Sequence, residues 1–332
     1  MPKTTNPFPT ARRPLKAALE FVEIGNLLGA QMKPTDPILN SQLKALIELA
    51  QPAKLTNGTN KTKLPYFVIQ KNDQPTPFER GILDPSICLI VQGKKLLNIA
   101  KETIYCNPGE FIASAIDMPI AGHVVKATPK EPYIGLRITF EPKEIFSVIK
   151  EAEIKINPKG TINPGAFVRP AHKNLGSLFL KLLEQAQSES SSKFIAGLAK
   201  KELIYELLAS EFNHLLLQNS SLFGKDKGIV RALDWIKENF DKTITVEEIA
   251  DESGMSASAL FSKFKAVTSM SPLQYQKQLR MQEARRLLMF GLMDVTRAAV
   301  EVGYASPNQF NREYKRFFGN PPLRDIKQLQ GP

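Results

Sequence analysis

The chain has 332 residues, of which 42% are hydrophobic and 23% are charged, and this composition is that of a folded protein rather than of a disordered segment. No stretch approaches the roughly 20 uninterrupted apolar residues that a membrane span needs. Glu20 and Glu23 interrupt the apolar segment near the N-terminus, where a secretory signal would carry no charge. The sequence therefore predicts a cytoplasmic protein with no membrane partner, long enough for two domains.

The net charge of +11 favours an anionic partner such as nucleic acid or an anionic membrane surface. Residues 222–253 hold five basic and eight acidic side chains, whereas residues 254–332 hold twelve basic and five acidic ones. The last quarter of the chain thus carries most of the positive excess. This distribution is typical of a protein that binds the phosphate backbone of DNA.

Two cysteines, Cys88 and Cys106, are too few for a disulfide framework and fit a reducing compartment. They are interpreted either as small buried hydrophobic side chains or as sensors of oxidants or electrophiles. His123, His172 and His214 lie far apart and show no metal-binding spacing, so we expect no metal, no cofactor and no enzymatic activity. His123, in a predicted strand, either lines a ligand pocket or is a half-buried, hydrogen-bonded side chain.

The N-terminal half contains a predicted helix followed by predicted strands. Residues 1–32 form an extension without a functional signal, and Met32 is an alternative start. A helix is expected over residues 37–50, with Asp36 as its cap and Pro37 at its first position. Between residues 64 and 140, short β-rich runs alternate with turn signals such as Asn107-Pro108-Gly109, which predicts an antiparallel sandwich or small barrel able to hold one small ligand.

After Pro170 the apolar residues recur with the helical period, and two stripes mark two helices. These stripes are interpreted as a homodimer interface of paired helices, with packing inside the domain as the alternative. The first stripe contains Leu175, Leu178, Phe179, Leu182 and Leu183, and the second contains Phe194, Leu198, Leu203, Ile204, Leu207, Leu208, Phe212, Leu215 and Leu216. A linker is expected over residues 218–227.

The C-terminal part shows one pattern twice. A helix capped by Thr245, a turn at Gly254 and a helix capped by Ser256 form a helix-turn-helix unit, and Gly303 and Ser306 occupy the corresponding places 49 and 50 residues later. The helix expected between the units has roughly 18 residues and is therefore about 27 Å long. Two recognition helices about one DNA turn apart can enter successive major grooves.

The C-terminal third resembles the DNA-binding domain of the AraC/XylS family of bacterial transcription regulators. The resemblance covers about 100 residues in the family's order and spacing. The region from 64 to 145, with ICLIVQGKK, CNPGEF and DMPIAGHVVKATPKEPYIGLRI, is similar to the cupin-like N-terminal domain of one branch of the family. The C-terminal matches are Ile249-Ala250, Met255-Ser256, Leu260, Phe264-Lys265, Ser271-Pro272, Tyr275, Arg280, Ala284, Leu287-Leu288, Val295, Ala299, Gly303-Tyr304, Ser306, Phe310, Arg312, Tyr314-Lys315, Phe318-Gly319 and Pro321-Pro322.

The resemblance implies which side chains meet DNA. Arg pairs with guanine and Asn with adenine, so we expect the second recognition helix to discriminate bases better than the first. The expected base-reading residues are Ser258, Phe261, Ser262, Pro307, Asn308, Asn311 and Arg312. The expected phosphate contacts are Ser256, Lys263, Lys265, Ser306, Lys315 and Arg316. Candidates for a ligand site in the barrel are Cys88, Cys106 and His123.

Two departures from the family's pattern stand out. A glycine is usual before Ser271-Pro272, but the chain reads Thr268-Ser269-Met270 there, at an expected cost of about 1 kcal/mol if a left-handed turn is formed. The aromatic-Arg pair common after the last proline is replaced by Leu323-Arg324-Asp325, so the last helix is less firmly predicted.

The sequence thus predicts an α+β fold, with a cupin-like antiparallel β-barrel flanked by helices and an all-α double helix-turn-helix domain. The expected divisions are the extension 1–32, a sensor domain 33–170, a helical dimerisation segment and linker 171–221, and a DNA-binding domain 222–330. The predicted function is sequence-specific regulation of transcription on double-stranded promoter DNA, by a homodimer controlled by a small-molecule or electrophile effector. RNA polymerase is a further expected partner if the protein activates transcription.

Two alternatives are carried with this prediction. In the first, the protein is a constitutive DNA-binding regulator whose barrel serves only for dimerisation. In the second, the barrel is an enzyme with an accessory DNA-binding domain. The duplicated basic helices favour a regulator over the enzyme.

Overall fold

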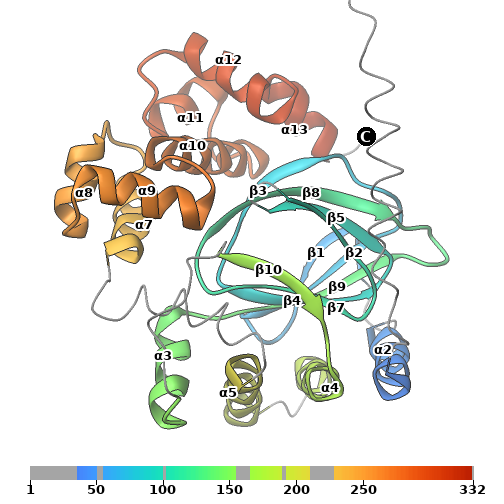
Figure 1. The fold of residues 1–332 in the computed structure, drawn as a ribbon. Helices are drawn as coiled ribbons and strands as arrows, with labels where there is room; N and C mark the ends of the chain where they lie inside the picture. Colours follow the sequence, from blue (N-terminus) through green and yellow to red (C-terminus); the bar gives the residue numbers. More distant parts are fainter. Residues whose placement is uncertain are drawn as a thin grey trace, which may run out of the picture. The chain divides into compact units, whose positions relative to one another are not determined.

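The computed structural model describes residues 36–50, 55–99, 102–154, 165–188, 192–209 and 228–330 (Figure 1). The extension 1–32, the linker 218–227 and the predicted apolar positions Phe212, Leu215 and Leu216 lie outside these ranges. The described residues from Ile38 onward belong to one compact unit. Within the described ranges, no helix has the length and apolar character that crossing a membrane requires.

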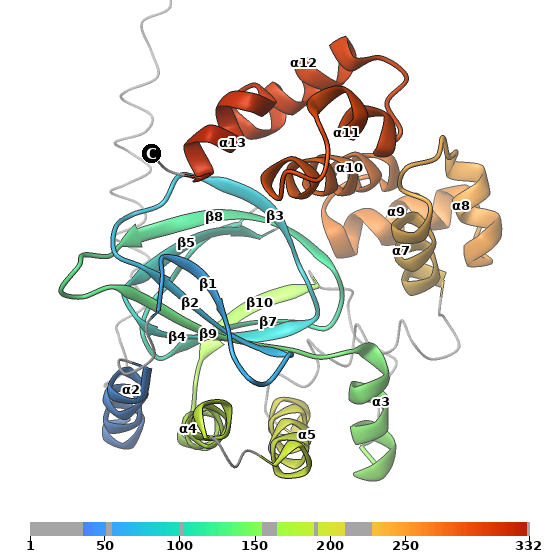
Figure 2. The ribbon, with the colours of Figure 1, turned by 180° about the vertical axis from the view of Figure 1, so that it is seen from behind.

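In the part of the chain that the structure describes, ten antiparallel strands build two sheets that face each other as a barrel (Figures 1 and 2). The larger sheet has the order β1-β2-β9-β4-β7-β10, and the smaller has the order β3-β8-β5-β6. The strands are β1 (Gly58–Lys61), β2 (Phe67–Asn72), β3 (Glu79–Leu83), β4 (Ser86–Gln92), β5 (Lys94–Ile99), β6 (Glu102–Cys106), β7 (Glu110–Ser114), β8 (Met118–Lys126), β9 (Tyr133–Thr139) and β10 (Ala166–Pro170).

The predicted barrel is confirmed, and the structure adds three strands that the pattern of apolar residues did not mark. β4 and β9 pair along the middle of the larger sheet because both are almost continuously apolar and buried. β1 reads GTNK and β3 begins with exposed Glu79 and Arg80, so neither carries the alternation that predicts a strand. β10 forms by pairing with β7 across more than 50 residues of sequence.

Helices α2 (Pro37–Ala50), α4 (Lys173–Gln187) and α5 (Lys193–Ala209) lie along the outer face of the larger sheet (Figures 1 and 2). The helix expected over 37–50 is confirmed. A further helix, α3 (Pro142–Glu151), follows β9 and contacts α5, although the pattern of apolar residues did not indicate it. The rings of Phe67 on β2 and Phe179 on α4 meet edge to face at 6.5 Å between centroids, which joins the helical layer to the sheet.

Most of the two apolar stripes are buried inside their own domain. All the predicted positions on α4, together with Leu203, Ile204, Leu207 and Leu208 on α5, belong to the core beneath the sheet. The alternative of packing inside the domain is therefore correct for these positions. Phe194 and Leu198 are instead 71% and 47% exposed.

The C-terminal domain is entirely helical over its described residues, and the predicted repeat is visible in it (Figure 1). Side-chain oxygens of Thr245, Ser256, Ser271, Asp294 and Ser306 cap five of its helices, each accepting a hydrogen bond from the backbone N–H three residues later. The helices are α7 (Gly228–Glu238), α8 (Val246–Ser253), α9 (Ala257–Thr268), α10 (Pro272–Met289), α11 (Val295–Glu301), α12 (Pro307–Phe318) and α13 (Pro322–Gln330).

Ser269 ends α9 in the left-handed conformation, with a φ of 63°, where the sequence analysis noted a missing glycine. We expect Ser269→Gly to raise the free energy of unfolding by about 1 kcal/mol, because glycine removes the Cβ strain. Urea denaturation followed by fluorescence of Trp235, the single tryptophan, measures this change in the C-terminal domain. Ser269→Ala retains the Cβ and is the control; an equal gain in both variants would contradict the explanation.

Candidate functional site

The second recognition helix, α12, presents polar side chains on one face and buries aromatic side chains on the other. Phe310 and Tyr314 are fully buried, and their rings lie 5.5 Å apart between centroids. Asn308 and Arg312 are exposed, whereas Pro307 and Asn311 are half-buried. The predicted base-reading residues therefore lie on or beside the open face of α12.

Arg312 makes no hydrogen bond or ion pair with the residues that the structure describes. Its neighbour Glu313 is already engaged: Lys277 Nζ lies 3.0 Å from its carboxylate, and the hydroxyl of Tyr304 donates to it at 2.7 Å. Arg312 therefore forms no ion pair with Glu313. A guanidinium without a protein partner is available for a base or a phosphate.

The first recognition helix, α9, also has one buried face and one exposed face, but its exposed side chains differ from those of α12. Leu260 and Phe264 are fully buried, and Ser258, Phe261 and Ser262 are exposed. Phe261 is 44% exposed, and the ammonium of Lys265 lies 5.9 Å from its ring centroid. This face offers two hydroxyls and one apolar ring, and so has fewer ways to distinguish bases than α12.

The predicted phosphate contacts lie on the same two helices. Lys265, Lys315 and Arg316 are exposed, and Lys263 is half-buried. Ser256 and Ser306 use their oxygens as helix caps, accepting from the backbone at 3.3 and 3.5 Å. A capping hydroxyl still has its proton to donate, so either serine can also reach a phosphate oxygen.

Arg280, in the middle of α10, connects the two helix-turn-helix units. Its guanidinium donates to the carbonyl oxygens of Phe240 at 2.6 Å, Lys242 at 2.8 Å and Gly303 at 2.8 Å, with a longer bond to Asp241 at 3.3 Å. Three of these carbonyls precede α8, and the fourth belongs to the turn before α12. The Arg280 side chain thus holds the turn before α12 of the second unit against the residues that precede α8 of the first unit.

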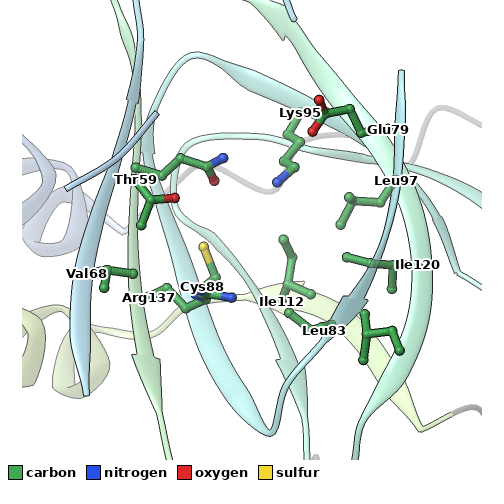
Figure 3. Close-up of a pocket in the computed structure, with 12 residues that line it drawn as sticks. Thr59, Val68, Glu79, Leu83, Cys88, Lys95, Leu97, Ile112, Ile120 and Arg137 are labelled. Carbon is green, nitrogen blue, oxygen red and sulfur yellow. The ribbon is translucent and has the colours of Figure 1, made fainter. Parts of the chain in front are cut away.

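Inside the barrel lies a cavity of about 270 Å³ (Figure 3). Its walls come from both sheets and combine aliphatic side chains with polar ones, three of which are charged. The lining residues are Thr59, Val68, Gln70, Glu79, Ile82, Leu83, Cys88, Lys95, Leu97, Ile112, Ile120 and Arg137. The β-rich pattern predicts a ligand site here but does not identify the charged residues, because it does not show which face of a strand points inward.

Of the three predicted ligand contacts, Cys88 lines this cavity, and Cys106 and His123 are not among its lining residues. Burial raises the pKa of the Cys88 thiol, and Lys95 and Arg137 oppose this effect more weakly. Burial, with a smaller contribution from Glu110, raises the pKa of Cys106 to about 12. His123 is half-buried, its ring meets that of Phe78 edge-on, and its Nδ1 has no hydrogen-bond partner among the described residues.

Strand β3, one wall of the cavity, contacts helix α10 of the C-terminal domain within the unit Ile38–Pro332. Gln278 Nε2 donates to the carbonyl oxygen of Gly81 at 2.7 Å, and the Arg80 guanidinium lies 5.3 Å from the Phe317 ring centroid. Arg285 Nη1 lies 3.6 Å from Oε1 of Glu79, which also lines the cavity. The same strand therefore borders both the cavity and the helix that joins the two DNA-binding units.

A β-barrel followed by two helix-turn-helix units defines the class of the protein as a helix-turn-helix regulator. The family model for the N-terminus of AraC-type transcriptional regulators matches residues 63–215, and a helix-turn-helix domain model matches residues 249–328. The chain belongs to the AraC-type transcriptional regulators. Both matched domains are those of a regulator and not of an enzyme, which confirms the expectation from the sequence.

Named relatives agree with this assignment. The transcriptional activator RhaS of Escherichia fergusonii is 28% identical over 149 residues, which cover 45% of this chain and 52% of RhaS. The lactose operon transcription activator of Staphylococcus xylosus is 23% identical over 243 residues, which cover 73% of this chain and 82% of that protein. The chain thus spans about half the length of RhaS and most of the length of the lactose operon activator.

Solved structures of ToxT from Vibrio cholerae share the fold. The apo form superposes with a TM-score of 0.56 at 11% identity and covers 81% of this chain and 98% of ToxT. A ToxT structure described as bound to an unsaturated fatty acid gives a TM-score of 0.54 at 11% identity, with coverage of 82% and 97%. At this identity the likeness extends to the fold alone.

Proposed function

We propose that the protein binds promoter DNA sequence-specifically and regulates transcription in the cytoplasm, with α9 and α12 entering successive major grooves. The observation that carries this proposal is Arg312, which has no partner among the described residues and lies near exposed Asn308 on α12. The opposite face of this helix is buried through Phe310 and Tyr314. The side chains of α12 match guanine and adenine, and those of α9 offer mainly contacts of low selectivity. The names of the relatives support activation, which would make RNA polymerase a partner.

Equilibrium binding to duplex DNA over a series of salt concentrations tests this proposal. Four cations, Lys263, Lys265, Lys315 and Arg316, are proposed to neutralise phosphates, and each contributes about 0.9 to the salt dependence. The logarithm of the binding constant should therefore fall against the logarithm of salt concentration with a slope of roughly −4. Undetectable binding at low salt, or a slope near zero, would overturn the proposal.

We propose further that a small molecule in the barrel cavity controls DNA binding. The described cavity supports this, as does the contact of its wall β3 with α10. Glu79 belongs to both features, because it lines the cavity and its Oε1 lies 3.6 Å from Nη1 of Arg285 on α10. Occupancy that moves Glu79 therefore acts on α10, the helix on which both DNA-binding units are mounted.

The burial of both thiols favours a reversible small molecule over a reactive electrophile. A thiolate is the reactive form of cysteine, and burial raises the pKa of Cys88 and of Cys106. At neutral pH both side chains are therefore protonated thiols. We propose that Cys88 contributes to the cavity wall as an apolar contact.

We propose that the protein is a homodimer that associates through α5. Four apolar side chains of α5 remain exposed after the helix has packed on its own domain: Phe194, Ile195, Leu198 and Tyr205. Phe194 and Leu198 are four residues apart and so share a face of the helix. Pairing with a second copy removes this apolar surface from water.

We expect Leu198→Glu to convert the dimer to a monomer, because it places a charge in the middle of the proposed interface. Light scattering coupled to size-exclusion chromatography measures the mass directly. Leu292→Glu changes a residue that is 58% exposed in the turn after α10 and should leave the dimer intact. A wild-type mass equal to that of one chain would contradict the dimer, and dissociation of both variants would contradict its location on α5.

A further inference from the structure

The cavity is lined by two cationic side chains that have no hydrogen-bond or ion-pair partner among the described residues. Lys95 on β5 and Arg137 on β9 both line it, and both are half-buried. Neither makes a hydrogen bond or an ion pair with the described part of the chain. Figure 3 shows the Lys95 ammonium pointing into the cavity and the Arg137 guanidinium lying beside the sulfur of Cys88. Burial raises the pKa of the Cys88 thiol and both cations act to lower it, so both cations lie around the same part of the cavity.

Cations removed from water without a partner are costly, and a bound anion relieves that cost. Arg137 has the planar fork that binds a carboxylate through two parallel hydrogen bonds, and Lys95 adds a point charge. The remaining charge of the lining is the carboxylate of Glu79, which is 45% exposed and lies near Arg285 at the surface. Two cations and one carboxylate leave a single positive charge, which matches a ligand with one negative charge.

The remaining lining residues indicate the size and polarity of the uncharged part of the ligand. Val68, Leu83 and Ile120 are among the apolar side chains that line the cavity, and Thr59 and Gln70 supply polar atoms. The volume of about 270 Å³ lies just below the usual range of roughly 300 to 1,000 Å³ for ligand pockets. An apolar body of modest size can therefore pack against the aliphatic side chains of the lining.

We infer that the effector is a small organic monoanion, a carboxylate on an apolar body, held by Lys95 and Arg137 inside the barrel. This inference rests on the proposed role of the cavity in regulation and specifies its ligand class. Binding places the carboxylate of the ligand in the same cavity as that of Glu79. Like charges repel, so occupancy pushes Glu79 toward Arg285 and strengthens the contact of β3 with α10.

Thermal denaturation and calorimetric titration of the full-length protein with hexanoate and benzoate test the inference. Hexanamide and benzamide are the matched neutral probes, since they keep the size and lose the charge. We expect the carboxylates to raise the melting temperature and the amides to have at least tenfold weaker affinity.

Lys95→Met and Arg137→Met should each lose at least ten-fold in carboxylate affinity. Lys94→Met should keep the wild-type affinity, because Lys94 lies on the opposite face of β5 over the ring of Tyr105.

DNA binding of every variant is measured in parallel and shows that each one is folded. Equal binding of amides and carboxylates, unchanged affinity in both cavity variants, or no binding of either carboxylate would each overturn the inference. If DNA binding persists in that case, the ligand class is wrong and the DNA-binding function stands. Loss of DNA binding in the wild-type protein itself would instead contradict the proposed function.

Discussion

Replacing Arg312 by alanine should weaken binding to the preferred duplex by roughly 1 to 3 kcal/mol, or about 5- to 150-fold, and should relax the preference at one base pair. The reason is that its guanidinium is exposed on α12, while the carboxylate beside it is occupied by Lys277 and Tyr304. Asn308→Ala should have an effect of the same size at a neighbouring base pair. Competition binding with duplexes changed one base pair at a time measures both the loss and its position.

Two control variants separate base reading from general attraction to DNA. Lys315→Ala should weaken binding to all duplexes about equally and reduce the salt slope by about 1. Arg297→Ala, on the neighbouring helix α11, removes an exposed arginine whose Nε lies 3.7 Å from Asp294, and should change neither affinity nor specificity much. If Arg312→Ala left affinity and base preference at wild-type values, its assignment to base reading would be wrong.

Gly303→Ala should lower the free energy of unfolding of the C-terminal domain by about 3 kcal/mol or more. Gly303 has a φ of +83°, and a Cβ built on it would lie 1.8 Å from the carbonyl oxygen of Asp241. The clash displaces the turn whose own carbonyl is held by Arg280. Urea denaturation followed by the fluorescence of Trp235 measures the loss, and DNA binding should fall with it.

Gly319→Ala is the matched control for Gly303→Ala. Gly319 has a φ of +86°, and no atom lies within 4 Å of the position of its Cβ. The substitution should cost only about 1 kcal/mol, which is the strain of the left-handed conformation alone. Equal losses in the two variants would show that the contact between Gly303 and the loop before α8 does not matter for stability.

The helical domain could be predicted almost in full because its signals are local. Thr245 with Glu248, Ser256, Asp294 and Ser306 cap their helices where the sequence places them. The left-handed conformation of Ser269 follows from its place after α9. The duplicated spacing indicated the two recognition helices and their buried anchors.

The cavity could not be predicted to the same depth, because it depends on pairings between distant strands. Lys95 and Arg137 line one cavity only when β5 and β9, from different sheets, are brought together, and neither residue lies in a motif. Glu79 belongs to a short strand with an exposed start. The helical stripes of α4 and α5 were visible in sequence, but whether a sheet or a second chain covers them depends on tertiary contacts.

Selection of bound fragments from random double-stranded DNA with the purified full-length protein tests the central claim most directly. We predict two blocks of preferred base pairs whose centres are about 10 base pairs apart, one for each recognition helix. The block contacted by α12 should be the sharper and should lose information in the Arg312→Ala protein. A selected pool with no preferred sequence, or with a single block unaffected by that substitution, would contradict the account.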